Sequence, residues 1–337
     1  MKPTPLAIAI LLAAGSPAAA EDVAAFYAGK SVRLVVGVDV GSGYDVNARL
    51  LARHMSAHIP GKPSFIVQNQ PGAGSATMTS QLYAAGPFDG TVIGAAFAGM
   101  PTLPLLQPGG ARFDPTKLIW LGNTNRETHV TYVWHSAPVQ SLAEARSREL
   151  IIGAQAPGSS QVDFPLVADA LLGFKFKVVA GYQSTGKINL GLESGEVQGT
   201  IAAWTTLKTL SSDWLKDGRI KVIAQWALRP NPELPGVPNV LDTASTESER
   251  AALRLVLARL DIGRPFFLPP NVPADRVAAL RQAFDATMKD PAYLGEAEKL
   301  KIDVDPITGA ELAALVAQVA QTSADTVARV RAALEHR

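Results

Sequence analysis

The feature that most constrains this chain is a pair of glycine-rich segments, each placed between an apolar run and a helical pattern. The first elbow, residues 41–45 (Gly-Ser-Gly-Tyr-Asp), follows the apolar residues 34–38; the second elbow, residues 71–75 (Pro-Gly-Ala-Gly-Ser), follows the apolar residues 65–67. A strand that turns through glycine into a helix points backbone N–H groups and the positive helix end at one spot, where an anion binds well. Neither elbow contains Lys or Arg, so a small carboxylate suits them better than a polyphosphate.

The rest of the chain places the elbows in an α/β protein. Strand-like and helix-like segments alternate along most of its length, which is typical of folds with largely parallel sheets. Two strand-like segments at 118–122 and 130–134 precede a restart of the pattern near residue 150, which indicates a second lobe. We expect strands at 32–38, 64–69, 91–97, 150–154, 176–180, 197–202 and 220–224, and helices near 45–58, 75–85, 161–172 and 309–335.

The first twenty residues are typical of a secretory signal. Lys2 gives a short basic start, residues 6–14 are apolar, and three alanines at 18–20 precede an acidic pair; this is the order found in cleavable signal peptides. The apolar run is shorter than the roughly 20 residues that a membrane-spanning helix needs. An N-terminal core helix is the alternative, but it would give the small-residue cleavage site no purpose.

Composition removes several functions. The chain has 31 Lys and Arg against 30 Asp and Glu, without a basic block, so nothing supports nucleic-acid binding. It has no cysteine, which excludes disulfides, thiolate metal sites and a cysteine nucleophile. Its 337 residues are enough for two lobes, and we expect no membrane span after residue 20.

Several motifs, read in order, resemble a known family. They are Arg-Leu-Val-Val at 33–36, the first elbow, Val-Gln-Asn-Gln-Pro-Gly-Ala-Gly-Ser at 67–75, Phe-Asp-Gly-Thr-Val-Ile-Gly at 88–94, Leu-Glu-Ser-Gly-Glu-Val at 192–197 and Pro-Glu-Leu-Pro-Gly-Val-Pro at 232–238. In these motifs the chain resembles the extracytoplasmic solute receptors of tripartite tricarboxylate transporters, the Bug receptors. The resemblance covers essentially the whole chain after the signal.

The resemblance implies a fold, a function and a location. The fold would be the two-lobed α/β fold of type II periplasmic binding proteins, each lobe a mostly parallel sheet flanked by helices, with the ligand cleft between the lobes. Residues 1–20 would be the signal peptide, 21–128 with 225–337 lobe I, and 129–224 lobe II. The protein would be a monomeric periplasmic receptor, not an enzyme, without cofactor or metal. It would capture a di- or tricarboxylate or an aromatic acid and deliver it to integral-membrane transporter subunits.

One departure from the family concerns the ligand. The family's first elbow commonly reads Pro-Gly-Gly, followed by small polar residues and Asp. Here Val40 stands in place of the proline, and Tyr44 adds a bulky ring before Asp45. An aromatic or longer acid is therefore among the expected ligands.

Ligand contacts are expected from both lobes. Each candidate has a plainer explanation as well, because a glycine often only permits a tight turn and a serine at a helix start is often only a cap. Two elbows in one lobe, together with the resemblance, favour the ligand interpretation. The candidates are Ser42, Gly43, Tyr44, Gly74 and Ser75 in lobe I, and Gly158, Ser159, Ser160, Tyr182, Gln183, Trp204 and Thr205 in lobe II.

Two charged residues near these candidates have competing interpretations. The carboxylate of Asp45 would repel an acid, so we expect it to cap a helix that starts at Val46. Arg126 lies near the predicted lobe crossover, where it pairs either with a second ligand carboxylate or, on the surface, with Glu127.

Two motifs partly match those of other binding sites, one for a nucleotide and one for a metal. Residues 181–187 match a P-loop until Ile188, which replaces the Ser or Thr that would hold Mg²⁺. His54 and His58 are one helical turn apart, as metal ligands can be. No acidic general base lies between them, so we expect a structural or surface role.

Two alternatives to transport remain open. A ligand-sensing periplasmic module for a signalling partner would carry the same sequence features, because a docking surface has no readable motif. A secreted α/β hydrolase is less well supported. Gly72-Ala-Gly-Ser-Ala does not fit Gly-x-Ser-x-Gly, and no His or Asp partner for Ser75 can be assigned.

Overall fold

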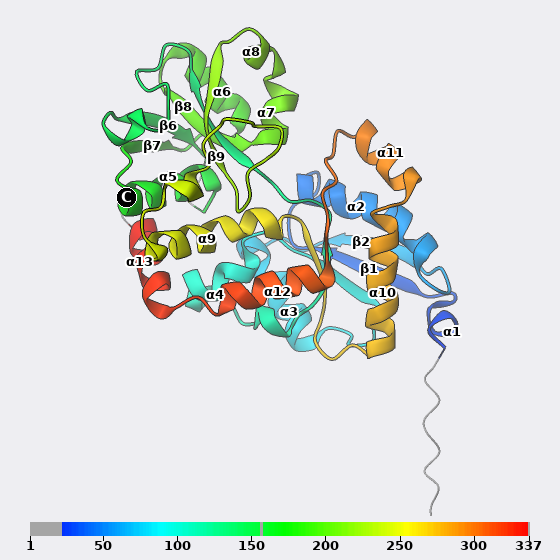
Figure 1. Ribbon diagram of the computed structural model, residues 1–337. Coiled ribbons are helices and arrows are strands. Elements are labelled where there is room, and N and C mark those ends of the chain that lie inside the picture. Colours follow the sequence, from blue (N-terminus) through cyan, green and yellow to red (C-terminus); the bar gives the residue numbers. More distant parts are fainter. Residues whose placement is uncertain (1–21, 156–157, 336–337) are drawn as a thin grey trace, which may run out of the picture.

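The computed structural model describes residues 22–155 and 158–335 (Figure 1). The signal peptide predicted at 1–20 lies outside the described residues. No helix in the described part of the chain is long and apolar enough to cross a membrane. Two sheets flanked by helices form an α/β molecule of two lobes, so the predicted fold class is confirmed.

The first sheet has six strands in the order β11-β4-β10-β3-β1-β2. Strand β1 pairs in parallel with β2 and β3, whereas β10 and β11 run antiparallel to their neighbours. Every residue of β3 is buried, as expected for a strand covered on both faces. The strands are β1 (Ser31–Val36), β2 (Ser64–Asn69), β3 (Val92–Ala95), β4 (Ile119–Asn123), β10 (Pro265–Leu268) and β11 (Ile307–Thr308).

The second sheet has five strands in the order β7-β6-β8-β5-β9. Strand β6 is parallel to β7 and β8, and β5, the first strand after the chain leaves the first sheet, is antiparallel to β8 and β9. Both sheets thus have a parallel part and an antiparallel part beside the crossovers. The strands are β5 (His129–Trp134), β6 (Leu150–Ala154), β7 (Phe176–Ala180), β8 (Gly199–Ala203) and β9 (Ile220–Trp226).

The helices cover both faces of each sheet. Helices α2, α10 and α11 pack together on one side of the first sheet, and α6 and α7 pack on the second. The helices are α1 (Val23–Tyr27), α2 (Gly43–Met55), α3 (Ala76–Ala85), α4 (Leu103–Leu106), α5 (Ser160–Leu172), α6 (Thr185–Ser194), α7 (Trp204–Leu210), α8 (Ser212–Lys216), α9 (Glu247–Ile262), α10 (Ala274–Thr287), α11 (Pro291–Lys299), α12 (Gly309–Ala320) and α13 (Ala324–Glu335).

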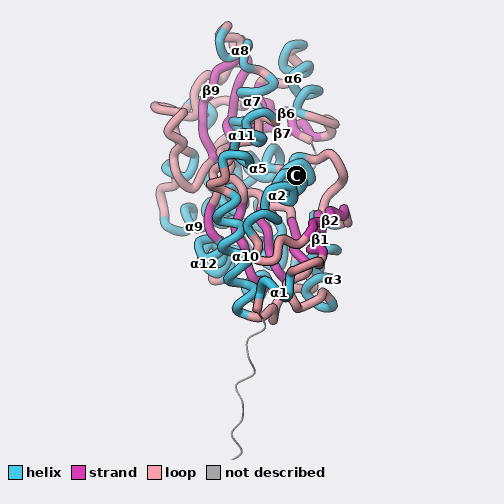
Figure 2. Tube along the Cα trace, turned by 90° about the vertical axis from the view of Figure 1, so that its right-hand side faces the viewer, coloured by secondary structure: helices cyan, strands magenta, loops and turns pink. Residues whose placement is uncertain are grey.

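One apolar core continues from the first lobe into the second. It contains Trp120 of β4 and Phe164 of α5 and is lined by α9, α12 and α13. The ring of Phe164 stacks on Trp226, with centroids 5.2 Å apart. Figure 2, turned by 90° from Figure 1, again separates the strands β6, β7 and β9 from β1 and β2. Each lobe therefore has its own sheet, and helices that contribute to the common core join the two lobes.

Two predicted helix boundaries are wrong. The single helix expected at 309–335 is two helices, because the Thr322 hydroxyl donates to the Val319 carbonyl (2.7 Å) and the Ser323 hydroxyl accepts from the Thr326 amide (3.2 Å). These side chains satisfy backbone groups that a continuous helix would use. Helix α2 begins at Gly43, with Ser42 rather than Asp45 as its cap.

Candidate functional site

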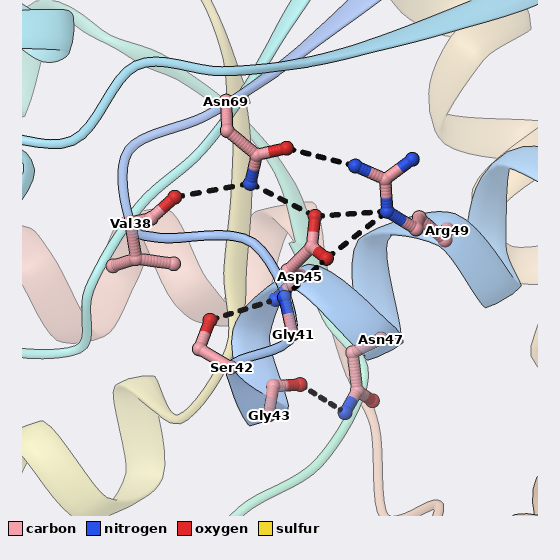
Figure 3. Close-up of polar contacts among 8 residues, drawn as sticks. All are labelled: Val38, Gly41, Ser42, Gly43, Asp45, Asn47, Arg49 and Asn69. Carbon is pink, nitrogen blue, oxygen red and sulfur yellow. Dashed lines mark hydrogen bonds and ion pairs between the residues drawn. The ribbon is translucent and has the colours of Figure 1, made fainter.

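The first elbow is held together by its own aspartate (Figure 3). The Ser42 hydroxyl accepts from the Asp45 amide (3.3 Å), and the buried Asp45 carboxylate accepts from the Gly41 amide (2.9 Å), Arg49 Nε (3.0 Å) and Asn69 Nδ2 (2.8 Å). Burial opposes ionisation, but these hydrogen bonds lower the pKa of Asp45 below its ordinary value. Asp45 therefore joins the elbow to the end of β2 and leaves no carboxylate directed at a ligand.

Tyr44 is partly buried against the first lobe. Its hydroxyl accepts from the Ala98 amide (3.2 Å) and donates to the Gly263 carbonyl (3.4 Å), and the Arg264 guanidinium lies 5.1 Å from its ring centroid. Burial raises the pKa of Tyr44 above its ordinary value. The neighbouring Gly43 also faces Arg264, because a Cβ on that glycine would lie 2.8 Å from the guanidinium. The contacts of both residues are therefore with segments next to β3 and β10 of the first sheet.

The second elbow has an unusual backbone. Ala73, Gly74 and Ser75 have positive φ angles of 46°, 59° and 73° in succession, a conformation that is costly for non-glycine residues and is maintained only by the surrounding structure. The fully buried Ser75 hydroxyl provides that support, because it donates to the Gly37 carbonyl (3.1 Å) and accepts from the Phe97 amide (2.9 Å). Ala73 and Gly74 remain at the surface of the elbow.

The start of α5 is the corresponding element of the second lobe. Gly158 has a φ of 89°, and its amide donates to Asp163 (3.1 Å), which also pairs with Arg259 (3.0 Å). Ser159 is the N-cap of α5 but makes no side-chain capping bond. Its hydroxyl is buried and has no hydrogen-bond partner among the described residues. An unpaired buried hydroxyl is costly, which distinguishes Ser159 from the other serines at these loops.

A cavity of about 720 Å³ lies between the second elbow and the start of α5. Its walls come from both lobes and from the C-terminal helix. The lining residues are Ala73, Gly74, Phe97, Gly99, Met100, Thr102, Leu103, Leu106, Gln107, Gln155, Gly158, Ser159, Val162, Asp163, Leu166, Arg259, Arg331, Leu334 and Glu335. Of the twelve predicted site residues, Gly74, Gly158 and Ser159 meet in this cavity. Its size is within the range of small-molecule sites.

A chain of polar contacts that sequence reasoning missed lies at the lobe boundary. Arg264 pairs with Glu127 (3.0 Å), Glu127 with His129 (3.3 Å), and the other ring nitrogen of His129 contacts the Ser160 hydroxyl (2.9 Å). Burial opposes ionisation of Glu127, but the bond from His129 and the Arg264 charge outweigh it and lower its pKa to about 2. We call these four residues the boundary relay. One of them is Ser160, a predicted ligand residue, whose hydroxyl contacts His129 and which does not line the cavity.

The other predicted residues of the second lobe lie elsewhere. Trp204 and Thr205 line a separate cavity of about 530 Å³ beside the crossover segments, where Trp204 Nε1 donates to Glu233 (2.6 Å). Tyr182 packs on α6, since a Cβ on Gly191 would lie 2.9 Å from its hydroxyl. The Gln183 carbonyl accepts from Gln155 (3.3 Å). None of these four residues lines the cavity at the second elbow.

The residues with competing interpretations also have structural partners. Arg126 pairs with Asp305 (Nε to Oδ2, 2.8 Å), which lowers its availability to a ligand. His54 contacts Glu296 (2.6 Å) and His58 contacts Asp290 (2.8 Å). These pairs attach α2 and the following turn to α11, which agrees with the structural role predicted for both histidines. Within the described ranges, no cluster of three or more potential metal ligands is present.

The geometry defines a class of protein: two α/β lobes with a ligand-sized cavity between them, as in periplasmic binding proteins. No family model and no curated protein sequence matches the chain. Solved structures do match. A TctC solute-binding protein from Polaromonas, without ligand, is 18% identical with a TM-score of 0.71, covering 92% of this chain and 100% of that one.

Two further structures are similar. R. palustris Rpa4515 with adipate is 21% identical, with a TM-score of 0.61, and the match covers 90% of this chain and 97% of that one. The periplasmic binding protein BugD is 21% identical, also with a TM-score of 0.61, over 90% and 98% of the two chains. The predicted resemblance to the Bug receptors is thus confirmed as a likeness of fold.

Proposed function

We propose that this protein is a periplasmic receptor that binds an organic acid between its lobes. The observation that carries the proposal is the cavity that joins the second elbow of one lobe to the start of α5 in the other. Helix α5 has 13 residues, and the N-terminus of such a helix attracts negative charge. The unpartnered Ser159 hydroxyl adds a donor at the same place.

In this proposal a carboxylate contacts Gly74 on one side and Ser159 on the other, beside Gly158, whose amide already donates to Asp163. Hydrogen bonds to a charged group contribute roughly 1.5–3 kcal/mol each. Three or four of them approach the –8.2 kcal/mol that corresponds to micromolar affinity. A diacid is a reasonable ligand class because a structure of the same fold contains adipate.

The transport role extends the binding proposal. The predicted signal would send the protein to the periplasm, where lobe I (21–128 and 225–337) and lobe II (129–224) would close on the acid about their crossovers. The closed monomer would then deliver the acid to the integral-membrane subunits of a tripartite tricarboxylate transporter. Trp204, Thr205, Tyr182 and Gln183 would approach the acid only in such a closed form.

The hydrolase alternative finds no support at Ser75. Its hydroxyl is fully buried and bonded to two backbone groups, Gly37 and Phe97. A nucleophilic serine needs access to substrate and a neighbouring base, and Ser75 has no access. A binding function therefore accounts better for the second elbow.

The test is calorimetric titration of residues 21–337 with di- and tricarboxylates, aromatic acids, acidic amino acids and uncharged controls, after denaturation and refolding to remove any bound acid. We expect one class to bind with micromolar affinity or tighter. Ser159→Ala should weaken that binding at least tenfold. A folded protein that binds none of these acids contradicts the proposal.

Ser184→Ala is the matched control. Ser184 caps α6 by accepting from the Lys187 amide (3.3 Å), and it does not line the cavity. The variant removes a serine from another helix start of the same lobe, so it should leave the affinity unchanged. Equal effects of the two substitutions would mean that Ser159 does not contact the acid.

A further inference from the structure

We propose that the cavity contains a second anion subsite, built by Arg331 of the C-terminal helix α13, and that the ligand is an elongated dicarboxylate with an apolar middle. This inference rests on the proposed function, because it assumes that one carboxylate occupies the start of α5. It adds the residue that binds the other carboxylate, and the length and polarity of the acid.

The size of the cavity points to a long ligand. Its volume of about 720 Å³ lies in the upper half of the range of roughly 300–1,000 Å³ found for small-molecule sites. A four-carbon acid would occupy a small part of that space and would leave apolar walls in contact with water. An acid long enough to cover those walls gains the free energy of burying its own chain, about 0.8 kcal/mol for each CH₂ group.

The lining combines polar groups with apolar side chains. Gly74, Gly158 and Ser159 provide backbone and hydroxyl groups. The apolar part is made by side chains of α4, α5, α13 and the segment after β3, namely Phe97, Met100, Leu103, Leu106, Val162, Leu166 and Leu334. Such a surface fits a methylene chain or a ring, and would exclude a ligand that is polar along its whole length.

Arg331 is a cation of this wall that makes no ion pair with a described residue, although the Glu335 carboxylate, one turn further along α13, lines the same cavity. Its Nε donates to the Leu105 carbonyl (2.7 Å), and its Nη2 contacts the same oxygen. No ion pair involving Arg331 occurs in the part of the chain that the structure describes. A guanidinium carries five N–H donors in a planar fork, so donors remain for a carboxylate, which arginine binds well.

The second arginine that lines the cavity, Arg259, does have an ion-pair partner. Arg259 pairs with the buried Asp163 (3.0 Å) and donates to the Gly158 carbonyl (3.1 Å). Its charge is neutralised within the protein, and its role is to hold the loop before α5. Of these two arginines, Arg331 is therefore the one suited to a ligand anion.

The break before α13 brings Arg331 to the cavity. Helix α13 turns away from the line of α12 and packs on α4, α5 and α9, so it touches elements of both lobes (Figure 1). The continuous helix expected from the sequence would have carried residue 331 onward along the α12 axis. The polar residues Thr322 and Ser323 thus allow helix α13 to contribute to the cavity.

The experiment compares diacids with matched monoacids. Adipate, suberate and sebacate are titrated calorimetrically against hexanoate, octanoate and decanoate, and suberate also against its monoamide, which keeps the length but removes one charge. For the best chain length we expect the diacid to bind ten- to a hundredfold more tightly than the monoacid or the monoamide. This is the range that a hydrogen bond to a charged group gives.

Arg331→Gln should remove the tighter binding of the diacid while changing the affinity for the monoacid less than twofold. Arg331→Lys should keep part of the preference for the diacid. Arg329→Gln is the control: Arg329 is exposed on the same helix, contacts Ser248 and does not line the cavity. If Arg331→Gln fails to fold, the comparison of suberate with its monoamide on the unmodified protein decides the question.

The possible failures are distinct. If the unmodified protein binds no acid of any length, the proposed function is wrong and the inference falls with it. If it binds acids but prefers diacids less than threefold over the monoamide, only the second subsite is wrong. The same conclusion follows if Arg331→Gln retains the full preference for the diacid.

Discussion

Helices α2 and α5 begin alike in sequence but differ in what their first turns bind. Each has 13 residues, follows a glycine-containing loop and has serine at its N-cap. At α2, the Ser42 hydroxyl accepts from the Asp45 amide, and the Asp45 carboxylate accepts from the Gly41 amide. At α5, the Asp163 carboxylate likewise accepts from the Gly158 amide, but Ser159 makes no capping bond and its hydroxyl lacks a partner among the described residues. A capping serine therefore marks where a helix starts, while its contacts decide whether that start stabilises the fold or can bind a ligand.

The positions of the two helices explain this difference. The first elbow is tied to β2 through Asn69, so its polar groups are used to join neighbouring strands. The start of α5 faces the cavity, and its orientation comes from the boundary relay through Ser160. Substitutions at α2 should therefore change stability, and substitutions at α5 should change binding.

Asp45→Ala should have the largest effect on stability. It leaves Arg49, Asn69 and the Gly41 amide without their shared acceptor, which costs about 3 kcal/mol. Urea unfolding measures this free energy. Asp213→Ala is the control, because Asp213 also lies in the first turn of a helix but is exposed. A loss below about 1 kcal/mol would mean that the first elbow is not held by its carboxylate.

Glu127→Gln tests the relay that orients α5. The pKa of Glu127 falls from 4.5 to about 2 in the folded protein, so its ionised form stabilises the fold above about pH 4.5, and this contribution is lost as the pH falls towards 2. This lowering of the pKa corresponds to a contribution of about 3 kcal/mol to the free energy of unfolding. Partial exposure of the carboxyl reduces that contribution to about 2 kcal/mol.

Urea unfolding at pH 7, 5, 4 and 3 checks this prediction for the unmodified chain and the variant. The gap in unfolding free energy should be widest at pH 7 and should narrow below pH 5. A gap that stays constant with pH would show that the ionised carboxylate is not the stabilising group.

Ser75→Ala should cost about 1–2 kcal/mol, because the Gly37 carbonyl and the Phe97 amide both lose the buried hydroxyl. Acid affinity should change little, since that hydroxyl does not reach the cavity. Parallel urea unfolding and calorimetry separate the two quantities. Affinity that falls tenfold with stability unchanged would reverse the roles assigned to Ser75 and Ser159.

Ser159→Ala should have the smallest effect on stability, below about 0.5 kcal/mol in either direction. Removing a buried hydroxyl without a partner costs no hydrogen bond and relieves a desolvation penalty. The same urea series measures it beside Ser75→Ala. A loss above about 1 kcal/mol would indicate that Ser159 has a structural partner, and would remove the contrast between α2 and α5.

Local interactions are the part of this protein that the sequence by itself determined. The alternation of strands and helices and the two elbows follow from hydrophobic periodicity and from the glycines between these elements, whereas the cap of α2 was wrongly assigned to Asp45. The predicted strand at 64–69 matches β2 to the residue, and the helix expected at 161–172 starts one residue earlier, at Ser160. Polar residues near a helix end are harder to interpret, and for that reason the break at residues 321–323 was missed.

Contacts between distant segments were decided only by the tertiary structure. Tyr44 reaches Gly263, Glu127 reaches Arg264, and the cavity combines the second elbow with a helix that ends at Glu335. Trp204 and Thr205, which seemed equivalent to Gly158 in the sequence, follow a different strand of the same sheet and line another cavity. The physical reason is that each of these contacts depends on which strand ends are neighbours and on how the lobes pack. A local sequence pattern predicts neither the neighbours of a strand nor the packing of the lobes.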